Sequence, residues 1–147
     1  MAIAKRLQVR HEDVFAHGAF VVSEVTQVLD FDASTRENKV QARDKDTGLP
    51  LWEADVLDPD PEAKKKGRTV TVKFAAKVQP VPPETLPGLP LRPVEFEGLT
   101  ALPYVDTNGN FSRIAWSFRA EAMHAPTGSP SGPAGVKAGS GDAGKAA

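Results

Sequence analysis

An alternation of apolar and polar residues around a glycine turn is the feature that most constrains this chain. Trp52, Ala54 and Val56 alternate with charged or polar neighbours, and residues 40–45 alternate in the same way. The sequence Asp-Thr-Gly at residues 46–48 lies between the two runs, and glycine readily adopts the positive φ that a tight turn requires. Two runs of period two around such a turn predict a β-hairpin over residues 39–58. We expect the rest of the chain to add strands to it.

Four more stretches have the composition of strands, because Val, Phe, Ile and Thr dominate them and no apolar repeat of helical spacing occurs. We expect bulges near Ser23 and at Gly98, where the alternation changes parity. In the last strand the alternation predicts that Ile114, Trp116, Phe118 and Ala120 point inward. The four predicted strands span residues 19–32, 68–78, 94–106 and 113–122.

A proline-rich segment separates the second and third of these strands. Residues 79–93 contain six prolines, so they can form neither a helix nor a central strand. We expect a stiff, partly polyproline crossover from one side of a barrel to the other. The alternative is that this segment is a ligand for a proline-binding domain.

Six strands without a confident helix favour a small barrel, because closing the sheet removes exposed edges. The predicted fold class is all-β, a closed or partly open barrel of five to six strands that is like the oligonucleotide-binding (OB) fold. An open β-sandwich is the alternative. We expect an N-terminal arm at residues 1–17, the barrel domain at 18–125 and a disordered tail rich in Gly, Ser, Pro and Ala at 126–147.

The composition excludes several classes of protein. The chain has no cysteine, which rules out disulfides and thiolate metal sites and agrees with a cytoplasmic location. Neither a long apolar run nor a signal peptide is visible, so we expect no membrane partner. The net charge is −1, which weighs against a nucleic-acid function argued from charge alone.

We expect no catalytic residue, metal or cofactor. His11, His17 and His124 lie near the two ends of the chain, and none has the spacing of a known catalytic or zinc motif. Two Asp- and Gly-containing segments, at residues 44–48 and 106–110, resemble parts of a calcium loop. Both lack its terminal Glu and fit hairpin turns better. The lysines at residues 64–66 could bind an anion, but a solvated loop is favoured.

The candidate binding surface is the polar side of the predicted strands. Alternation places several cations there, and two aromatic residues near the last turn could stack on bases. Trp52, Phe74, Trp116 and Phe118 fall on the apolar side and are expected in the core. On the residues alone, a nucleic-acid interface and an ordinary solvated face stand equal. The candidate nucleic-acid-binding residues are Arg43, Lys45, Lys73, Lys77, Tyr104, Phe111, Arg113 and Arg119.

Several sequence blocks follow one another in a characteristic order. They are residues 17–25 (HGAFVVSEV), 30–34 (DFDAS), 40–48 (VQARDKDTG), 51–52 (LW), 92–99 (RPVEFEGL) and 123–126 (MHAP). Together they resemble the actinobacterial (Streptomyces-type) family of plasmid replication, integration and excision activators. The resemblance covers roughly residues 9 to 126 and brings no catalytic motif and no set of binding residues.

The resemblance implies a non-enzymatic regulator of a plasmid or an integrative conjugative element. We expect it to act through nucleic acid, in particular single-stranded DNA. The alternative is a protein-interaction module that recruits or regulates an element-encoded initiator or integrase without binding DNA. An unpaired sheet edge would also allow two copies to form a homodimer.

Overall fold

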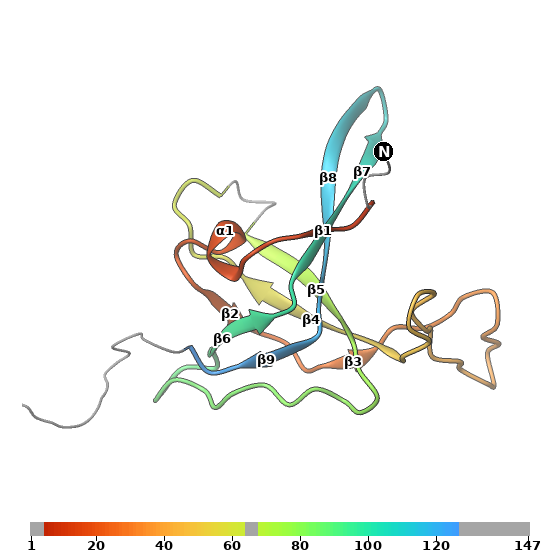
Figure 1. The fold of residues 1–147 in the computed structure, drawn as a ribbon, viewed down its shortest axis with the longest axis horizontal. Coiled ribbons are helices and arrows are strands. Elements are labelled where there is room, and N and C mark those ends of the chain that lie inside the picture. Colours follow the sequence, from red (N-terminus) through yellow and green to blue (C-terminus); the bar gives the residue numbers. More distant parts are fainter. Residues whose placement is uncertain (1–4, 64–67, 127–147) are drawn as a thin grey trace, which may run out of the picture.

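The computed structural model describes residues 5–63 and 68–126, which form one curled sheet and one short helix, α1 (His11–Val14) (Figure 1). Eight strands follow the order β1-β7-β8-β5-β4-β2-β6-β9, and β3 pairs with β4. All pairs are antiparallel except β5 with β8. The strands are β1 (Leu7–Gln8), β2 (Ala19–Val21), β3 (Thr26–Gln27), β4 (Leu51–Leu57), β5 (Thr69–Ala75), β6 (Arg92–Glu97), β7 (Thr100–Asn108), β8 (Phe111–Ala120) and β9 (Ala122–His124).

The centre of the sheet is the pair β4–β5, which is in register over all seven residues of each strand. Ala54 and Val56 of β4 and Val72 and Phe74 of β5 are buried, and each alternates with a more exposed neighbour. This alternation is the period-two pattern of the sequence, so the predicted inward faces of both strands are confirmed. The same side chains form the centre of the hydrophobic core.

The predicted hairpin partner of β4 is wrong. Residues 40–45 form no strand. They make two isolated bridges, Leu29↔Gln41 and Arg43↔Pro50, and single backbone hydrogen bonds to residues 28, 30 and 51. The reason is that β4 has no free edge, because β5 occupies one side and β2 and β3 the other. Residues 40–50 therefore form a loop, called here the Asp-Gly loop, that closes on itself through hydrogen bonds from Asp44 N to Leu49 O and from Gly48 N to Asp44 O.

Three of the expected strands are each divided in two, so the sheet has more strands than the predicted five or six. Residues 19–32 give β2 and β3, with the break at the expected bulge, and residues 94–106 give β6 and β7 around Gly98. The third divided strand is the one predicted at residues 113–122, which gives β8 and β9 with Glu121 between them. The mostly-β class is confirmed, and the eight-strand path curls through 216° as a half-barrel.

The chain bends at Gly98, between β6 and β7, and at Glu121, between β8 and β9. Each bent stretch contributes one strand to either end of the curled sheet. The strands β7 and β8 pair near one end of the path, while β6 and β9 pair at the other. At the corner Gly98 has a φ of 61°, Leu99 is buried in the core, and Glu121 N donates to Glu97 O at 2.9 Å. Two long bent strands thus run around the half-barrel side by side.

Beyond the sheet, β7 and β8 continue as a two-stranded ribbon that projects from the body (Figure 1). β5 reaches β8 only at residues 118–120, and β1 reaches β7 only at residues 100–101. The prediction that Ile114 and Trp116 point into the core is wrong, because their side chains are 70% and 48% exposed. Their strand alternates correctly, but within residues 5–63 and 68–126 no layer faces this part of it. Phe118 and Ala120, nearer the body, do pack on the core.

The N-terminal segment is anchored to the body rather than free. Phe15 is buried in the core, and His11 lies with its ring 5.4 Å from the ring of Phe15 and 5.7 Å from that of Phe96. Phe96 N donates a hydrogen bond to His11 Nδ1 at 3.2 Å. Burial lowers the pKa of His11, which keeps the ring neutral and Nδ1 available as an acceptor.

The predicted crossover, residues 79–93, is confirmed as free of helix and strand over residues 79–91. It is wrong at its end, because Arg92 and Pro93 begin β6 and are register partners of Val21 and Phe20. The predicted tail, apart from Pro126, and the lysines at residues 64–66 lie outside the described residues.

We predict that Gly98→Ala lowers the free energy of unfolding by about 1–2 kcal/mol, because an L-residue resists this positive φ. A Cβ here would also lie 2.6 Å from Glu121 Cδ. Urea unfolding measures the change. The double variant Gly98→Ala/Glu121→Ala should recover only the part due to crowding. A single variant as stable as the parent would contradict the proposed role of this corner.

Candidate nucleic-acid interface

A cleft of about 870 Å³ lies where the N-terminal segment, the Asp-Gly loop, β5 and the base of the β7–β8 ribbon meet. We call it the basic cleft, because it is lined by more cations than acids. Its acidic residues are Asp44 and Asp46. Its neutral residues are Gln8, Leu51, Thr100, Leu102 and Ser117. Its cationic residues are Lys5, Arg6, Arg43, Lys45, Lys73 and Arg119.

The floor of the cleft is one row of residues across four strands. Lys73 of β5 is the register partner of Arg119 of β8, Arg119 is the partner of Thr100 of β7, and Thr100 is the partner of Gln8 of β1. Register partners present their side chains on the same face of a sheet. Two segments remote in sequence, β5 and β8, therefore place two cations side by side through the parallel pair.

A buried ion pair fixes the Asp-Gly loop over this floor. Asp44 is 6% exposed and pairs with the guanidinium of Arg119, while its other carboxylate oxygen accepts hydrogen bonds from Thr47 N and Thr47 Oγ1 at 3.0 and 2.7 Å. Arg119 is thus committed to holding the loop. Arg119, which the sequence predicted as a nucleic-acid-binding residue, is paired with Asp44 in this structure. The loop that it holds carries Arg43 and Lys45, both of which are exposed.

The carboxylate of Asp44 stays ionised in this position. Burial by itself would raise the pKa of Asp44, but the hydrogen bonds from Thr47 and the positive charge of Arg119 outweigh it and lower the pKa below its usual value. The stabilisation that this carboxylate contributes is complete above the unfolded-state pKa of about 4 and is lost as the pH falls through the lower folded value.

The N-terminal segment places a further positive charge, that of Arg6, close to Arg119 in the cleft. Arg6 is partly buried and donates to Thr100 Oγ1 at 3.3 Å. Burial and the neighbouring charge of Arg119 lower the pKa of Arg6, against the opposing effect of Asp44 and Asp46. A site where cations are held close at a cost in repulsion favours the binding of an anion, which relieves that repulsion.

The structure brings some of the predicted site residues together and separates others. Four line the basic cleft: Arg43, Lys45, Lys73 and Arg119. Three lie on the ribbon: Tyr104, Phe111 and Arg113. Lys77 follows the end of β5 and does not line the cleft. Arg113 forms an ion pair with Asp106 of the facing strand at 3.2 Å.

One face of the ribbon continues the cleft. Leu102 and Ser117, which line the cleft, are register partners, and the alternate positions beyond them carry Tyr104, Arg113 and Phe111. Tyr104 and Phe111 are exposed, so their rings are accessible. We call this side of the ribbon the groove face. Its residues are Leu102, Tyr104, Asp106, Asn108, Phe111, Arg113, Ala115 and Ser117.

Sequence reasoning missed the N-terminal wall of the cleft. Lys5 and Arg6 fell in a segment that was expected to be an arm, because the strand that follows them is only two residues long. The available signal was the alternation of Arg6 and Gln8 with Leu7 and Val9, which is too short to predict a strand by itself.

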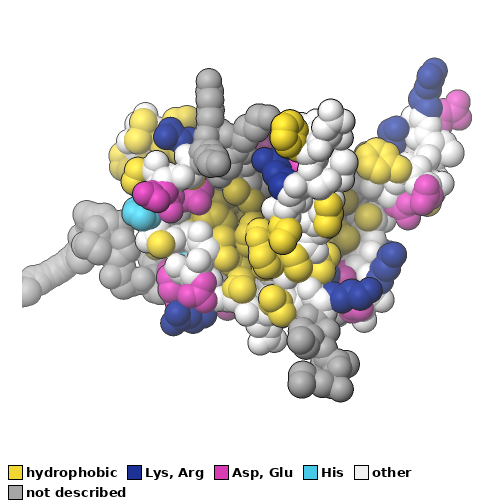
Figure 2. All heavy atoms as spheres, turned by 90° about the horizontal axis from the view of Figure 1, so that it is seen from above, with side chains coloured by type: hydrophobic (Ala, Val, Ile, Leu, Met, Phe, Trp, Pro, Cys, Tyr) yellow, Lys and Arg dark blue, Asp and Glu magenta, His cyan; other side chains and the backbone are white. Residues whose placement is uncertain are grey.

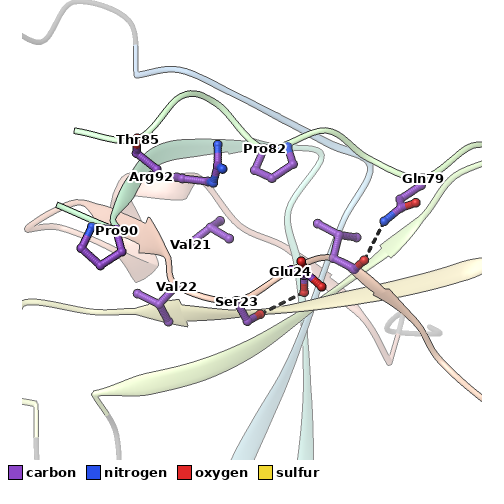
Figure 3. A pocket seen from close by; sticks show the side chains of 10 residues that line it. Val21, Val22, Ser23, Glu24, Gln79, Pro82, Thr85, Pro90 and Arg92 are labelled. Carbon is purple, nitrogen blue, oxygen red and sulfur yellow. Dashed lines mark hydrogen bonds between the residues drawn. The ribbon is translucent and has the colours of Figure 1, made fainter. Parts of the chain in front are cut away.

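A second cavity, of about 490 Å³, lies between the break that separates β2 from β3 and the proline-rich crossover (Figure 3). Gln79 Nε2 donates to Val25 O, and Arg92 Nη1 donates to Pro83 O, each at 2.7 Å. These bonds fasten the crossover over the cavity. Arg92 and Glu24 are its only charged lining residues in the described chain, so it does not match the charge of nucleic acid.

Comparisons of the chain with protein-family models, with curated proteins and with solved structures give no match. Within residues 5–63 and 68–126, no group of three or more His, Asp or Glu side chains is placed to hold a metal ion. In the same ranges no helix is long and apolar enough to cross a membrane.

We predict that Asp44→Asn lowers the free energy of unfolding at pH 7 by about 2–3 kcal/mol, because it leaves Arg119 without a charged partner. The difference from the parent should begin to shrink as the pH falls below about 4, the unfolded-state pKa, and should disappear as the pH passes the lower folded-state pKa, where the native carboxylate becomes protonated. Denaturant unfolding at both pH values measures this. Asp46→Asn, at an exposed position in the same loop, is the control and should change little. An equal loss at both pH values would contradict the ion-pair account.

Proposed function

We propose that this chain is a non-enzymatic activator of the replication, integration and excision of a plasmid or integrative conjugative element, and that it acts by binding single-stranded DNA in the basic cleft. The observation that carries the binding proposal is the cleft itself, where six cations and two acids converge in a chain of net charge −1. The link to a mobile element rests on the sequence resemblance described above.

We also infer that the half-barrel is a partly open barrel of the OB type. With β2 and β3, β6 and β7, and β8 and β9 each counted as one interrupted strand, and with the two-residue β1 set aside, the body has five strands and a Greek-key connection through the crossover. In OB folds the ligand lies across the second and third strands, between the loop that joins the first two strands and the loop that joins the last two. Here those positions correspond to β4, β5, the Asp-Gly loop and the β7–β8 turn.

The arrangement suits a single strand of nucleic acid. The cations of the cleft other than Arg119, which is paired with Asp44, would contact phosphates, and such contacts supply affinity without regard to sequence. The exposed rings of Tyr104 and Phe111 lie on the continuation of the cleft, where bases could stack on them. No helix of the described chain is long enough to read a major groove, since α1 has four residues. We therefore expect weak sequence preference.

The second candidate function is a protein-interaction module that recruits or regulates an initiator or integrase. Two observations favour it: the net charge is close to neutral, and the projecting ribbon exposes apolar side chains such as Val105 and Ile114. In that case a partner would be recovered from cells that carry the element even after nuclease treatment.

We predict that the parent binds a short labelled single-stranded oligonucleotide with an affinity that falls steeply as salt rises, measured by fluorescence anisotropy. Lys45→Ala and Lys73→Ala should each weaken binding severalfold and reduce the slope of log K against log salt by about 0.7, the contribution of one phosphate contact. Lys77→Ala removes the same charge four residues beyond Lys73 but outside the cleft, and should leave both quantities unchanged.

Absence of binding by the parent at low salt would overturn the nucleic-acid proposal. An effect of Lys77→Ala as large as that of Lys73→Ala would show that the cleft is not the site.

We predict that Phe111→Ala and Tyr104→Ala each weaken binding by roughly tenfold through loss of base stacking, while the salt slope stays as in the parent. Val105→Ala, on the other side of the same ribbon, is the control and should bind normally. A reduced salt slope in Phe111→Ala, or normal affinity in both aromatic variants, would contradict the role given to the groove face.

A further inference from the structure

The side of the ribbon that faces away from the basic cleft is apolar and uncovered. Register pairs Pro103 with Trp116 and Val105 with Ile114, so these four side chains lie together on one face. All four are exposed. Figure 2 looks down on the molecule from the side toward which the ribbon projects, and it shows hydrophobic side chains gathered near the middle, with Lys and Arg side chains both beside them and at the margins. We call the four residues the apolar face of the ribbon.

This part of the ribbon has little support from the rest of the described chain. Residues 102–117 pair only with each other, and neither β1 nor β5 reaches them. An isolated two-stranded hairpin is marginally stable in water, and a free strand edge beside apolar side chains favours pairing with another chain. Such a surface is characteristic of a contact with a partner.

We propose that the apolar face of the ribbon is the contact between two copies of this chain in a symmetric homodimer. An isologous contact uses one patch twice, so the patch must complement itself. A two-fold axis through the middle of this face would set the Pro103–Trp116 pair of one copy against the Val105–Ile114 pair of the other. Aromatic and β-branched side chains pack well in such pairs.

The distribution of charge favours a second copy over nucleic acid. The nearest charged residues on the ribbon, Asp106 and Arg113, are register partners on the groove face and pair with each other. Phosphates would therefore find no cation on the apolar face, whereas a second apolar face would bury no charge. Packing through this face leaves the basic clefts of both copies pointing outward and open.

The size of the contact sets its strength. The free part of β7 covers seven residues, 102–108, so the ribbon is about 23 Å long and about 10 Å wide. Two such faces bury several hundred Å² in total, which is below the roughly 1,200 Å² of stable complexes. The dimer should therefore be weak and visible only as concentration rises.

Sedimentation velocity of the full chain over a range from low micromolar to near-millimolar concentration tests the proposal. The parent should shift from monomer to dimer across this range. Ile114→Glu should remain monomeric throughout, because the two-fold axis would bring two buried like charges together. Its thermal stability should match that of the parent, since position 114 is 70% exposed.

Asn110→Glu adds the same charge at the exposed turn of the ribbon, away from the apolar face, and should dimerise like the parent. Val105→Glu should repeat the effect of Ile114→Glu. A parent that stays monomeric at every concentration, or a dimer that Ile114→Glu does not weaken, would overturn the proposal.

The test is separate from that of the proposed function. Monomeric Ile114→Glu should keep the parent affinity per chain for single-stranded DNA, because residue 114 lies off the groove face. A monomeric parent whose affinity for the oligonucleotide falls in Ile114→Glu would assign this face to nucleic acid and overturn the dimer. A monomeric parent in which Trp116 fluorescence changes on removal of residues 1–4 would assign it to the chain's own N-terminus, with the same consequence.

Discussion

The bend shared by two long strands is the constraint on which the rest of this structure depends. At Gly98 and Glu121 the pairs β6–β9 and β7–β8 turn a corner together, and the buried side chain of Leu99 holds the inside of that corner. Because the strands bend, one end of the sheet curls around the core and the other end leaves it as a free ribbon. The same feature therefore forms the body, places β8 beside β5 at the cleft, and leaves both faces of the ribbon exposed.

Most of the fold follows from local alternation, and the failures have one physical cause. The alternating apolar residues of β4 and β5, such as Val72 and Phe74, lie on a sheet face that is buried in the core. Alternation therefore predicted the inner faces of both strands correctly. The pattern at residues 40–45 is equally regular, but β4 had no edge left to accept a strand there. Likewise, Ile114 and Trp116 alternate as core residues do, yet no second layer of the described part of the chain covers them. Alternation predicts which residues share a face, whereas tertiary topology decides whether that face is covered.

The candidate site was only partly predictable for a related reason. Strand parity placed Lys73 and Arg119 on polar faces, and the parallel pairing of β5 with β8 then brought them together. No pattern in the sequence indicates that pairing, because the paired residues, such as Val72 and Phe118, are 46 positions apart in the chain. Nor does it indicate that Asp44 would occupy Arg119 in a buried ion pair. The sequence shows which cations lie on polar strand faces. The fold decides which of them line the cleft, that Arg119 is paired with Asp44, and that Lys77 is exposed outside the cleft.

The central claim is that single-stranded DNA enters the basic cleft and continues along the groove face of the ribbon. Mapping of backbone amide chemical shifts during titration with a single-stranded oligonucleotide tests it most directly. The account predicts the largest changes at Lys73, Leu102 and Ser117 and along the groove face, with little change in the proline-rich crossover at residues 79–91. Changes confined to the crossover and its cavity, or no change at saturating oligonucleotide, would contradict it.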